Sequence, residues 1–236
     1  MNMKLTQNPI KILFLLCLIV VFSSKAQTNP KESDDYKKYL KIYNQAKKYS
    51  DITVAKTALY ELMVLDPADA TLLDSLMFIY FEYNQYAPSV LVSMDVLQRN
   101  PNNLMALEIS AISYENLQLY DKAVRAYESL YLRNNDLQTM YKIAFLQYNL
   151  KRFAEAKTSA DIVIKNPQSD TLRIIFNPTR NTQEEVTMKS AILNLKGLMA
   201  KEQGNKEEAR RLFTEALAPG DPFTFAQQNL TSLDEN

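Results

Sequence analysis

Apolar side chains recur along this chain at the spacing of amphipathic helices, and the pattern repeats every 34 residues. The stretch 104–137 shows the repeat best, because residues of the same character stand 34 positions before its own. These pairs are Leu73 and Leu107, Tyr80 and Tyr114, and Tyr86 and Tyr120. Tyr141 and Tyr148 continue the spacing beyond it. A fixed period of this length with two apolar-periodic segments is typical of stacked helix–turn–helix repeats, so the sequence predicts an all-α solenoid.

Five units follow from the positions of the apolar stripes. They span residues 36–69, 70–103, 104–137, 138–167 and 190–218. Pro67 ends the first unit, because proline cannot continue a helix. In the fourth unit the step from Tyr148 to Phe153 is one residue shorter than the same step in the third unit. We expect the missing residue in the turn between the two helices, because loops tolerate changes of length.

Residues 168–189 interrupt the period between the fourth and fifth units and add about 18 positions. Thr171–Phe176 is β-branched and apolar, Asn177 and Pro178 favour a turn, and alternation resumes over Glu185–Met188. These features predict a small β-hairpin. The alternative is a long helix that begins at Thr182, because T-Q-E-E fits a capping box and the apolar residues after it keep helical spacing.

The N-terminal residues 1–26 have the pattern of an export signal. Lys4 and Lys11 make the start positive, residues 12–22 form an uncharged apolar run, and Ser24 and Ala26 stand where signal peptidase requires small residues. We therefore expect cleavage after Ala26 and a periplasmic or secreted mature protein. The run is shorter than the ~20 residues that span a bilayer, so we expect no membrane span in the mature chain.

Two shorter segments flank the repeats. Residues 27–35 are polar, and we expect a short linker there. After Ala218 the sequence Pro-Gly-Asp-Pro ends the last repeat, and Asp221 is placed to cap a further helix. The residues Phe223, Ala226, Leu230 and Leu233 then form one apolar face. Residues 219–236 are therefore predicted to hold a capping helix and a tail, as the end of a solenoid requires.

Composition limits the chemistry that is available. The 236 residues include only 3 Gly, which favours helices, and they contain no His, no Trp and a single Cys at position 17. The usual zinc, copper and haem ligands are thus missing, and no calcium-loop spacing of carboxylates occurs. No acidic pair stands with a nucleophile, a base or a glycine-rich phosphate loop. We expect no catalytic residue, no metal and no cofactor; a hydrolase or a sugar-binding protein is a disfavoured alternative.

Charge bears on the partner. The formal net charge of the whole chain is zero, and without residues 1–26 the chain holds 24 basic and 27 acidic residues. Nucleic-acid binding needs clustered lysine and arginine to contact phosphates. The sequence therefore predicts that nucleic acid is not the partner.

The placement of small and aromatic residues resembles that of the tetratricopeptide repeat family. The residues that carry the resemblance are Gly197, Ala200, Ala209, Phe213 and Ala216, then Tyr114, Ala123 and Tyr127, and finally Ala55 and Pro67. Ser89 departs from the family pattern, in which alanine begins the second helix, and Asn135 departs from its final proline. The resemblance implies about five units in a right-handed superhelix, with first helices that line a concave groove. Together with the signal, it resembles exported bacterial members of the cell envelope.

The family's geometry implies which side chains line that groove. Asn44, Phe78, Ile112, Leu146 and Leu198 form one row, Phe81 adds to it, and Asp74, Glu108 and Lys142 form a neighbouring row. The alternative is that these residues pack between units, which helical apolar stripes do by default. The family's clamp for chaperone C-terminal carboxylates is absent, because apolar residues and a serine replace its lysines and asparagines.

These observations predict a non-catalytic scaffold that binds a protein or peptide partner of unknown identity through its concave groove. The alternative is an accessory or assembly subunit of an envelope complex that acts through its insertion or convex face. Leu172 and Ile174–Phe176 give the insertion much apolar surface for a loop, which would permit docking or self-association if it were exposed. That surface would be covered if the insertion folded back onto the fourth and fifth units.

Overall fold

The computed structural model describes residues 29–235, so the predicted signal peptide and its cleavage point lie outside the described residues. This part of the chain holds eleven α-helices, two short 3₁₀ helices and one two-stranded antiparallel sheet. None of these helices combines the length and apolarity that crossing a membrane requires. The chain divides into two compact units, Met1–Ala68 and Asp69–Asn236, which we describe separately.

The first unit is a single helical hairpin. The 3₁₀ turn η1 (Pro30–Glu32) precedes α2 (Asp34–Lys48), and α3 (Ile52–Leu65) packs against α2. The Ser33 hydroxyl accepts a hydrogen bond from Tyr36 N at 3.1 Å, which satisfies one of the free N–H groups at the helix start. The helix therefore begins at Asp34, inside the segment that we expected to be a linker.

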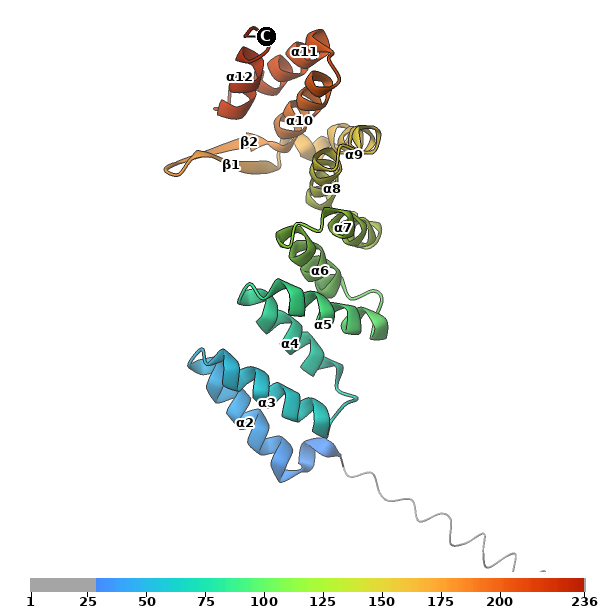
Figure 1. The fold of residues 1–236 in the computed structure, drawn as a ribbon, viewed down its shortest axis with the longest axis vertical. Coiled ribbons are helices and arrows are strands. Elements are labelled where there is room, and N and C mark those ends of the chain that lie inside the picture. The colour runs from blue at the N-terminus through green and yellow to red at the C-terminus, as the bar shows by residue number, and fades with distance from the viewer. Residues whose placement is uncertain (1–28, 236) are drawn as a thin grey trace, which may run out of the picture. The chain divides into compact units, whose positions relative to one another are not determined.

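The second unit continues with four further hairpins and a closing helix (Figure 1). The hairpins are α4 (Ala70–Glu82) with α5 (Tyr86–Arg99), α6 (Leu104–Asn116) with α7 (Tyr120–Asn134), α8 (Leu137–Asn149) with α9 (Phe153–Lys165), and α10 (Met188–Glu202) with α11 (Lys206–Leu217). The closing helix is α12 (Thr224–Thr231), and the 3₁₀ turn η2 (Pro167–Asp170) follows α9. The five predicted helical hairpins are thus present in residues 29–235.

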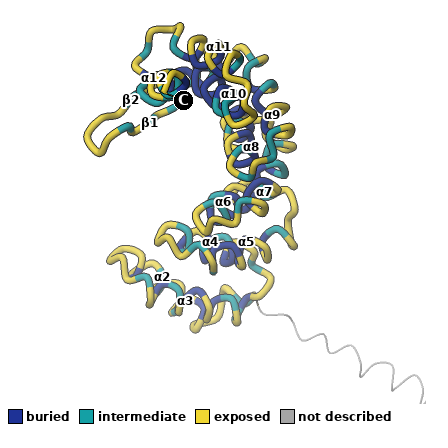
Figure 2. The backbone as a smooth tube through the Cα atoms, turned by 45° about the horizontal axis from the view of Figure 1, so that its top comes forward, coloured by how far each residue is buried: buried dark blue, intermediate teal, exposed yellow. Residues whose placement is uncertain are grey.

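A residue with left-handed backbone conformation marks the turn inside every hairpin. These residues are Ser50, Asn84, Gln118, Lys151 and Gly204, with φ between 54° and 77°. Five positions after each of them stands a small side chain that is fully buried, namely Ala55, Ser89, Ala123, Ala156 and Ala209. Small residues let the paired helices approach closely. Ser89 therefore fills the alanine position of the family pattern without a change of packing, and Figure 2 shows buried residues where helices meet.

The fourth unit is shorter than the third, but the missing residue does not come from the turn inside its hairpin. The turns 117–119 and 150–152 both hold three residues. Instead, the connection from α7 to α8 holds two residues, compared with four between α5 and α6. Asn135 ends α7 with φ of 50°, a conformation that asparagine tolerates and that stops a helix abruptly. The expectation of a shortened turn is therefore wrong.

The insertion is a β-hairpin, as predicted, but residues 180–181 form its turn, whereas Asn177 and Pro178 belong to the first strand. Strand β1 (Arg173–Thr179) pairs antiparallel with β2 (Thr182–Thr187), with Ile174 opposite Val186 and an irregularity toward the tip. The alternative of a helix from Thr182 is wrong, because α10 begins only at Met188, after the Thr187 hydroxyl accepts a hydrogen bond from Ser190 N at 3.0 Å. The helical spacing in that alternative is real, but it belongs to α10 alone.

The β-hairpin is fastened to the start of α12. The prediction that Asp221 caps this helix is wrong. Asp221 instead forms an ion pair with Arg173 of β1. The cap comes from β2, where a Glu184 carboxylate oxygen accepts a hydrogen bond from Thr224 N at 2.8 Å. The ring of Phe176 lies 5.0 Å from that of Phe223, between centroids. The insertion thus folds back onto the solenoid end, although its tip is exposed (Figure 2).

Candidate functional site

A pocket of about 650 Å³ lies between α6, α8 and β1 in the second unit. Figures 1 and 2 both show the β-hairpin on the side of this unit where the first helices α6 and α8 lie. Side chains of the solenoid that line it include Glu108, Ile112, Glu115, Tyr141, Lys142 and Phe145. Arg173–Phe176 of β1 supply the opposite wall. The predicted groove and the inserted segment therefore meet in one site.

The repeat geometry explains which side chain each first helix directs to this face. In every hairpin, one side chain of the first helix stands six residues before the left-handed turn residue. This side chain is at least partly exposed to solvent in all five hairpins. The position is occupied by Asn44, Phe78, Ile112, Phe145 and Leu198. Phe145 is 40% exposed, whereas Leu146 is 1% exposed and belongs to the core. Phe145, and not Leu146, therefore holds the outward place in this row, because the residue lost before α8 moves the row by one position.

The same shift affects the neighbouring row. Asp74 and Glu108 stand ten positions before their turn residues, and the corresponding position in α8 is Tyr141. Lys142 is the next residue along, yet its side chain lines the pocket because it reaches across to α6. The pocket thus brings together three of the predicted site residues, Glu108, Ile112 and Lys142.

Other predicted site residues lie elsewhere. On α4, Phe78 is 42% exposed, and Phe81 is half-buried with its ring 6.3 Å from that of Tyr86. Asp74 accepts a hydrogen bond from Asn103 Nδ2 at 3.3 Å, which ties α4 to the start of α6. None of these three residues lines the pocket.

Two further predicted residues are separate from the pocket. Leu198 of α10 is partly buried against the core of the last repeat. Asn44 is an exposed residue of the first unit, and it is described with that unit only. The pocket therefore depends on the third and fourth repeats and on the insertion.

Glu115 is held by hydrogen bonds on both oxygens. Tyr127 Oη donates to one at 2.8 Å, and Lys142 Nζ donates to the other at 3.2 Å. Burial and the Glu115 carboxylate raise the pKa of Tyr127 well above its ordinary value, and burial raises the pKa of Tyr141 to about 12. Both phenols are therefore neutral near pH 7, and Tyr127 already donates its single proton to Glu115.

Two carboxylates of the pocket, Glu108 and Asp136, have no ionic partner within residues 29–235. Lys142 neutralises Glu115, Arg173 is paired with Asp221, and Asp136 accepts a hydrogen bond from Thr139 N at 2.8 Å as the cap of α8. Glu108 is exposed and forms no ion pair within residues 29–235. A guest in this pocket would meet apolar side chains, neutral phenols and two carboxylates without an ion pair, of which Asp136 also caps α8.

The described part of the chain shows no arrangement that would hold a metal ion. Among residues 29–235 no group of three or more His, Cys, Asp or Glu side chains is suitably gathered. What the pocket offers is apolar contact, hydrogen bonding and charge attraction. These are the means by which a surface recognises a peptide.

Sequence reasoning missed Phe145, Tyr141 and the way β1 closes the pocket. The apolar residues Ile174–Phe176 were a sign that the insertion matters, but nothing in the sequence placed them beside α6 and α8. The groove-facing row moves by one position in α8 because the connection at Asn135 is shorter. The available signal was that Asn135 stands where the family pattern has a proline.

Comparisons with known proteins agree on the fold. A sequence model of the tetratricopeptide repeat family matches residues 138–169, and a search of curated proteins found no match. A tetratricopeptide repeat protein from Parabacteroides merdae superposes with a TM-score of 0.60 at 17% identity, over 85% of this chain and 73% of that one. MamA from Desulfovibrio magneticus gives 0.56 at 15% identity, over 79% and 95% respectively.

YrrB is a further similar structure, described as a TPR protein with an unusual peptide-binding site. It superposes with a TM-score of 0.61 at 14% identity, over 87% of this chain and 98% of its own. Likenesses at such identities show the fold alone. The chain therefore has the helical-hairpin solenoid architecture of tetratricopeptide repeat proteins, with a two-stranded sheet inserted between its fourth and fifth hairpins.

Proposed function

We propose that this tetratricopeptide-type solenoid is a non-catalytic scaffold that binds a peptide segment of a partner protein in the pocket between α6, α8 and β1. One observation carries the proposal: the pocket presents exposed apolar side chains from two separate elements. Phe145 of α8 is 40% exposed and Ile175 of β1 is 55% exposed. Exposed apolar surface rimmed by polar groups is typical of a binding site.

The character of the pocket supports a peptide rather than a small cofactor. It is bounded by β1 and by helices of the third and fourth repeats, and its lining combines apolar side chains with carboxylates and phenols. Peptide recognition commonly combines such apolar anchors with backbone and charge contacts. The peptide-binding site of YrrB, a protein of the same fold, points to the same class of partner.

Selection from a random peptide display library tests this proposal. Peptides that bind the purified chain are titrated against the variants Phe145→Asp and Leu132→Asp. Leu132 is 82% exposed on α7 and does not line the pocket, so it is the matched control. We expect Phe145→Asp to weaken binding at least about tenfold and Leu132→Asp to leave it unchanged, with both variants folded by circular dichroism. Equal effects, or a library without binders, would refute the proposal.

We also propose that the scaffold works outside the cytoplasm, in the bacterial cell envelope. The support is the sequence of residues 1–26, with its basic start, apolar run and small residues before Gln27. Cell fractionation with N-terminal sequencing tests it, and the expected mature protein begins at Gln27 in the periplasmic or secreted fraction. An unprocessed protein in the cytoplasm would contradict the proposal.

An assembly subunit that acts through its insertion is the second candidate. The exposed Ile175 favours it, because the same side chain could meet another copy of the chain or a subunit of a larger complex. Light scattering distinguishes the two functions. An assembly role requires a mass above that of one chain, which Ile175→Asp lowers and Phe145→Asp leaves unchanged.

A further inference from the structure

Among residues 29–235, strand β1 has a neighbouring strand on one edge only. Met188 N donates to Leu172 O at 2.8 Å, and the register continues with Ile174 opposite Val186. In an antiparallel ladder, hydrogen-bonded and non-hydrogen-bonded pairs alternate. Ile174 therefore directs its N–H and C=O toward β2, while Arg173 and Ile175 direct theirs to the opposite edge.

That opposite edge borders the pocket. The side chains of a strand alternate between its two faces, so a face turned to a cavity would contribute every second residue. The pocket is lined instead by the four consecutive residues Arg173–Phe176 and, within the described part of the chain, by no residue of β2. Consecutive residues from one strand indicate that its edge points into the space.

The free edge is short and accessible. Toward the tip of the hairpin the register shifts between Phe176 and Thr179, and Pro178 has no N–H to donate. At the other end the edge begins at Arg173. The alternation of the ladder turns Arg173 N and Ile175 N away from β2, and outside the ladder neither donates to a backbone acceptor within residues 29–235. The edge therefore offers one short set of backbone donors and acceptors, enough to pair with a few residues of an extended chain.

The charge of the pocket selects among extended segments. Glu108 lines the same space as the free edge and has no ion pair within residues 29–235. The two bases of the pocket, Lys142 and Arg173, are already paired with carboxylates. A lysine or arginine on the guest would therefore find a partner, whereas an acidic side chain would be repelled.

We infer that the pocket takes its guest as a third strand: an extended peptide pairs with the backbone of Arg173 and Ile175, and a basic side chain of the guest reaches Glu108. This inference rests on the proposed function and specifies its mode and its partner chemistry. Apolar residues that alternate with the basic one would contact Phe145 and Ile112 of the opposite wall. Strand addition to a sheet edge is a general mode of peptide recognition.

The test uses the peptides selected from the random library on the wild-type chain, titrated against Ile175→Pro and Ile175→Ala. Both changes remove the same apolar side chain, but only proline removes the N–H that faces the guest. Pairing between β1 and β2 does not use this N–H. We expect Ile175→Pro to bind about tenfold more weakly than Ile175→Ala, and the selected peptides to be rich in lysine or arginine next to apolar residues.

Amide exchange of the wild-type chain gives an independent measurement. The Ile175 N–H should exchange quickly in the free chain and slow on addition of a selected peptide, while the Ile174 N–H is protected in both states. Glu108→Gln should reduce the preference for basic over neutral peptides, with Asp136 the remaining unpaired carboxylate of the pocket. If the two Ile175 variants bind equally and Ile175 N–H stays unprotected, strand addition is wrong. The proposed function would survive that result so long as Phe145→Asp still weakens binding.

Discussion

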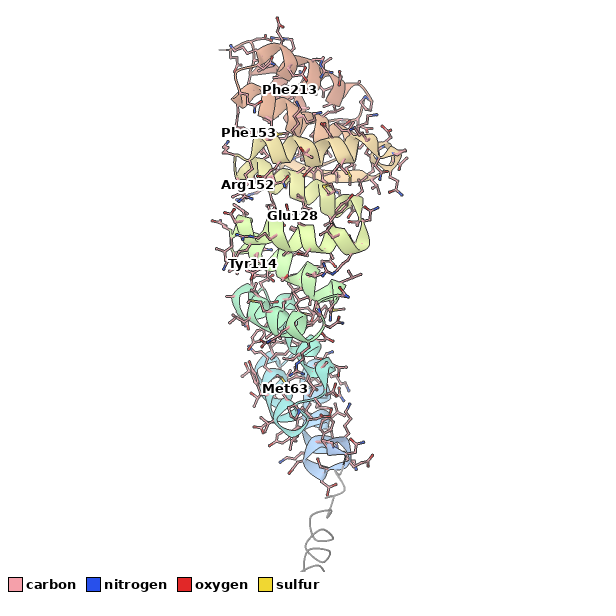
Figure 3. The ribbon with its side chains drawn as sticks, turned by 90° about the vertical axis from the view of Figure 1, so that its right-hand side faces the viewer. Met63, Tyr114, Glu128, Arg152, Phe153 and Phe213 are labelled. Atoms are coloured by element: carbon pink, nitrogen blue, oxygen red, sulfur yellow. The ribbon has the colours of Figure 1, made fainter. Side chains whose placement is uncertain are left out.

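The contact between Gly197 and Phe213 is the tightest approach of paired helices at a glycine in this structure, and it makes a strong prediction. A Cβ built on Gly197 of α10 would lie 2.4 Å from Phe213 Cε1 and 2.6 Å from Cδ1. The Phe213 ring is fully buried in α11, so it has no solvent-side space into which to move (Figure 3). We therefore predict that Gly197→Ala destabilises the last hairpin.

The magnitude follows from two opposing effects. Forcing an extra methyl into a packed interior costs about 1–3 kcal/mol, and contacts this short place the cost toward the upper end. Alanine is also a better helix former than glycine by about 1 kcal/mol, which offsets part of that cost. The expected net change is a loss of about 1–2 kcal/mol in the free energy of unfolding.

Size compensation within the repeats supports the same reasoning. Gly197 stands seven positions before its turn residue, and Phe213 stands nine after it. In the second hairpin the corresponding residues are Met77 and Ser93, both fully buried. The third hairpin pairs Ala111 with Tyr127, so a large residue is matched by a small one in three of the five hairpins. The fourth holds two alanines at these positions, Ala144 and Ala160, and the first holds Tyr43 and Leu59.

A double-mutant cycle isolates the clash. Phe213→Leu alone should cost about 1–2 kcal/mol, part of what removing a buried phenylalanine costs. In that background, Gly197→Ala no longer meets a ring, so only its helix preference remains and it should stabilise by up to about 1 kcal/mol. Urea unfolding followed by far-UV circular dichroism measures all four proteins. If Gly197→Ala has the same sign in both backgrounds, the close approach does not limit this position.

Three other changes are predicted. Gln118→Gly should raise the free energy of unfolding by about 0.5–1 kcal/mol, because Gln118 has φ of 59° and glycine adopts this conformation without strain; a lowered urea midpoint would contradict it. Tyr127 has a raised pKa in the folded state, so the stability that its neutral form contributes is complete below its ordinary pKa of 10.0 and is lost as the pH rises above that value. The unfolding temperature of Tyr127→Phe should consequently fall less between neutral and strongly alkaline pH than the unfolding temperature of the wild-type chain. Glu184→Ala should speed amide exchange of Thr224 and cost about 1 kcal/mol, the usual value of a helix cap, whereas unchanged exchange would show that the cap is dispensable.

Sequence reasoning reached the repeats because they depend on local and periodic features. A small residue at the start of the second helix and an apolar stripe recur in each hairpin, and the periodicity reveals them without tertiary information. The β-hairpin was predictable for the same reason, since β-branched residues are a local signal. The place of its turn was not, because Asn177 and Pro178 lie within β1 and residues 180–181 join the strands.

The composition of the pocket depends on features that are not local. The connection at Asn135 is shorter, but every apolar stripe stays intact. The sequence pattern alone therefore does not say whether the missing residue lies before or after α8. The consequence is a shift of one position, which exchanges the exposed Phe145 for the buried Leu146. The cap of α12 shows the same limit, because Glu184 reaches Thr224 from a separate element of the chain.

The way the β-hairpin is anchored explains how its free edge can stay available. The exposed ion pair between Arg173 and Asp221 is worth at most about 1 kcal/mol, so it does not hold the strand by itself. The larger contribution comes from Ile174 and Phe176, which are half-buried against the core of the last repeats. Burying an apolar side chain of this size is worth about 1.5–3 kcal/mol when complete. The strand is therefore held by one set of side chains and by β2, and neither attachment uses the backbone groups that face the pocket.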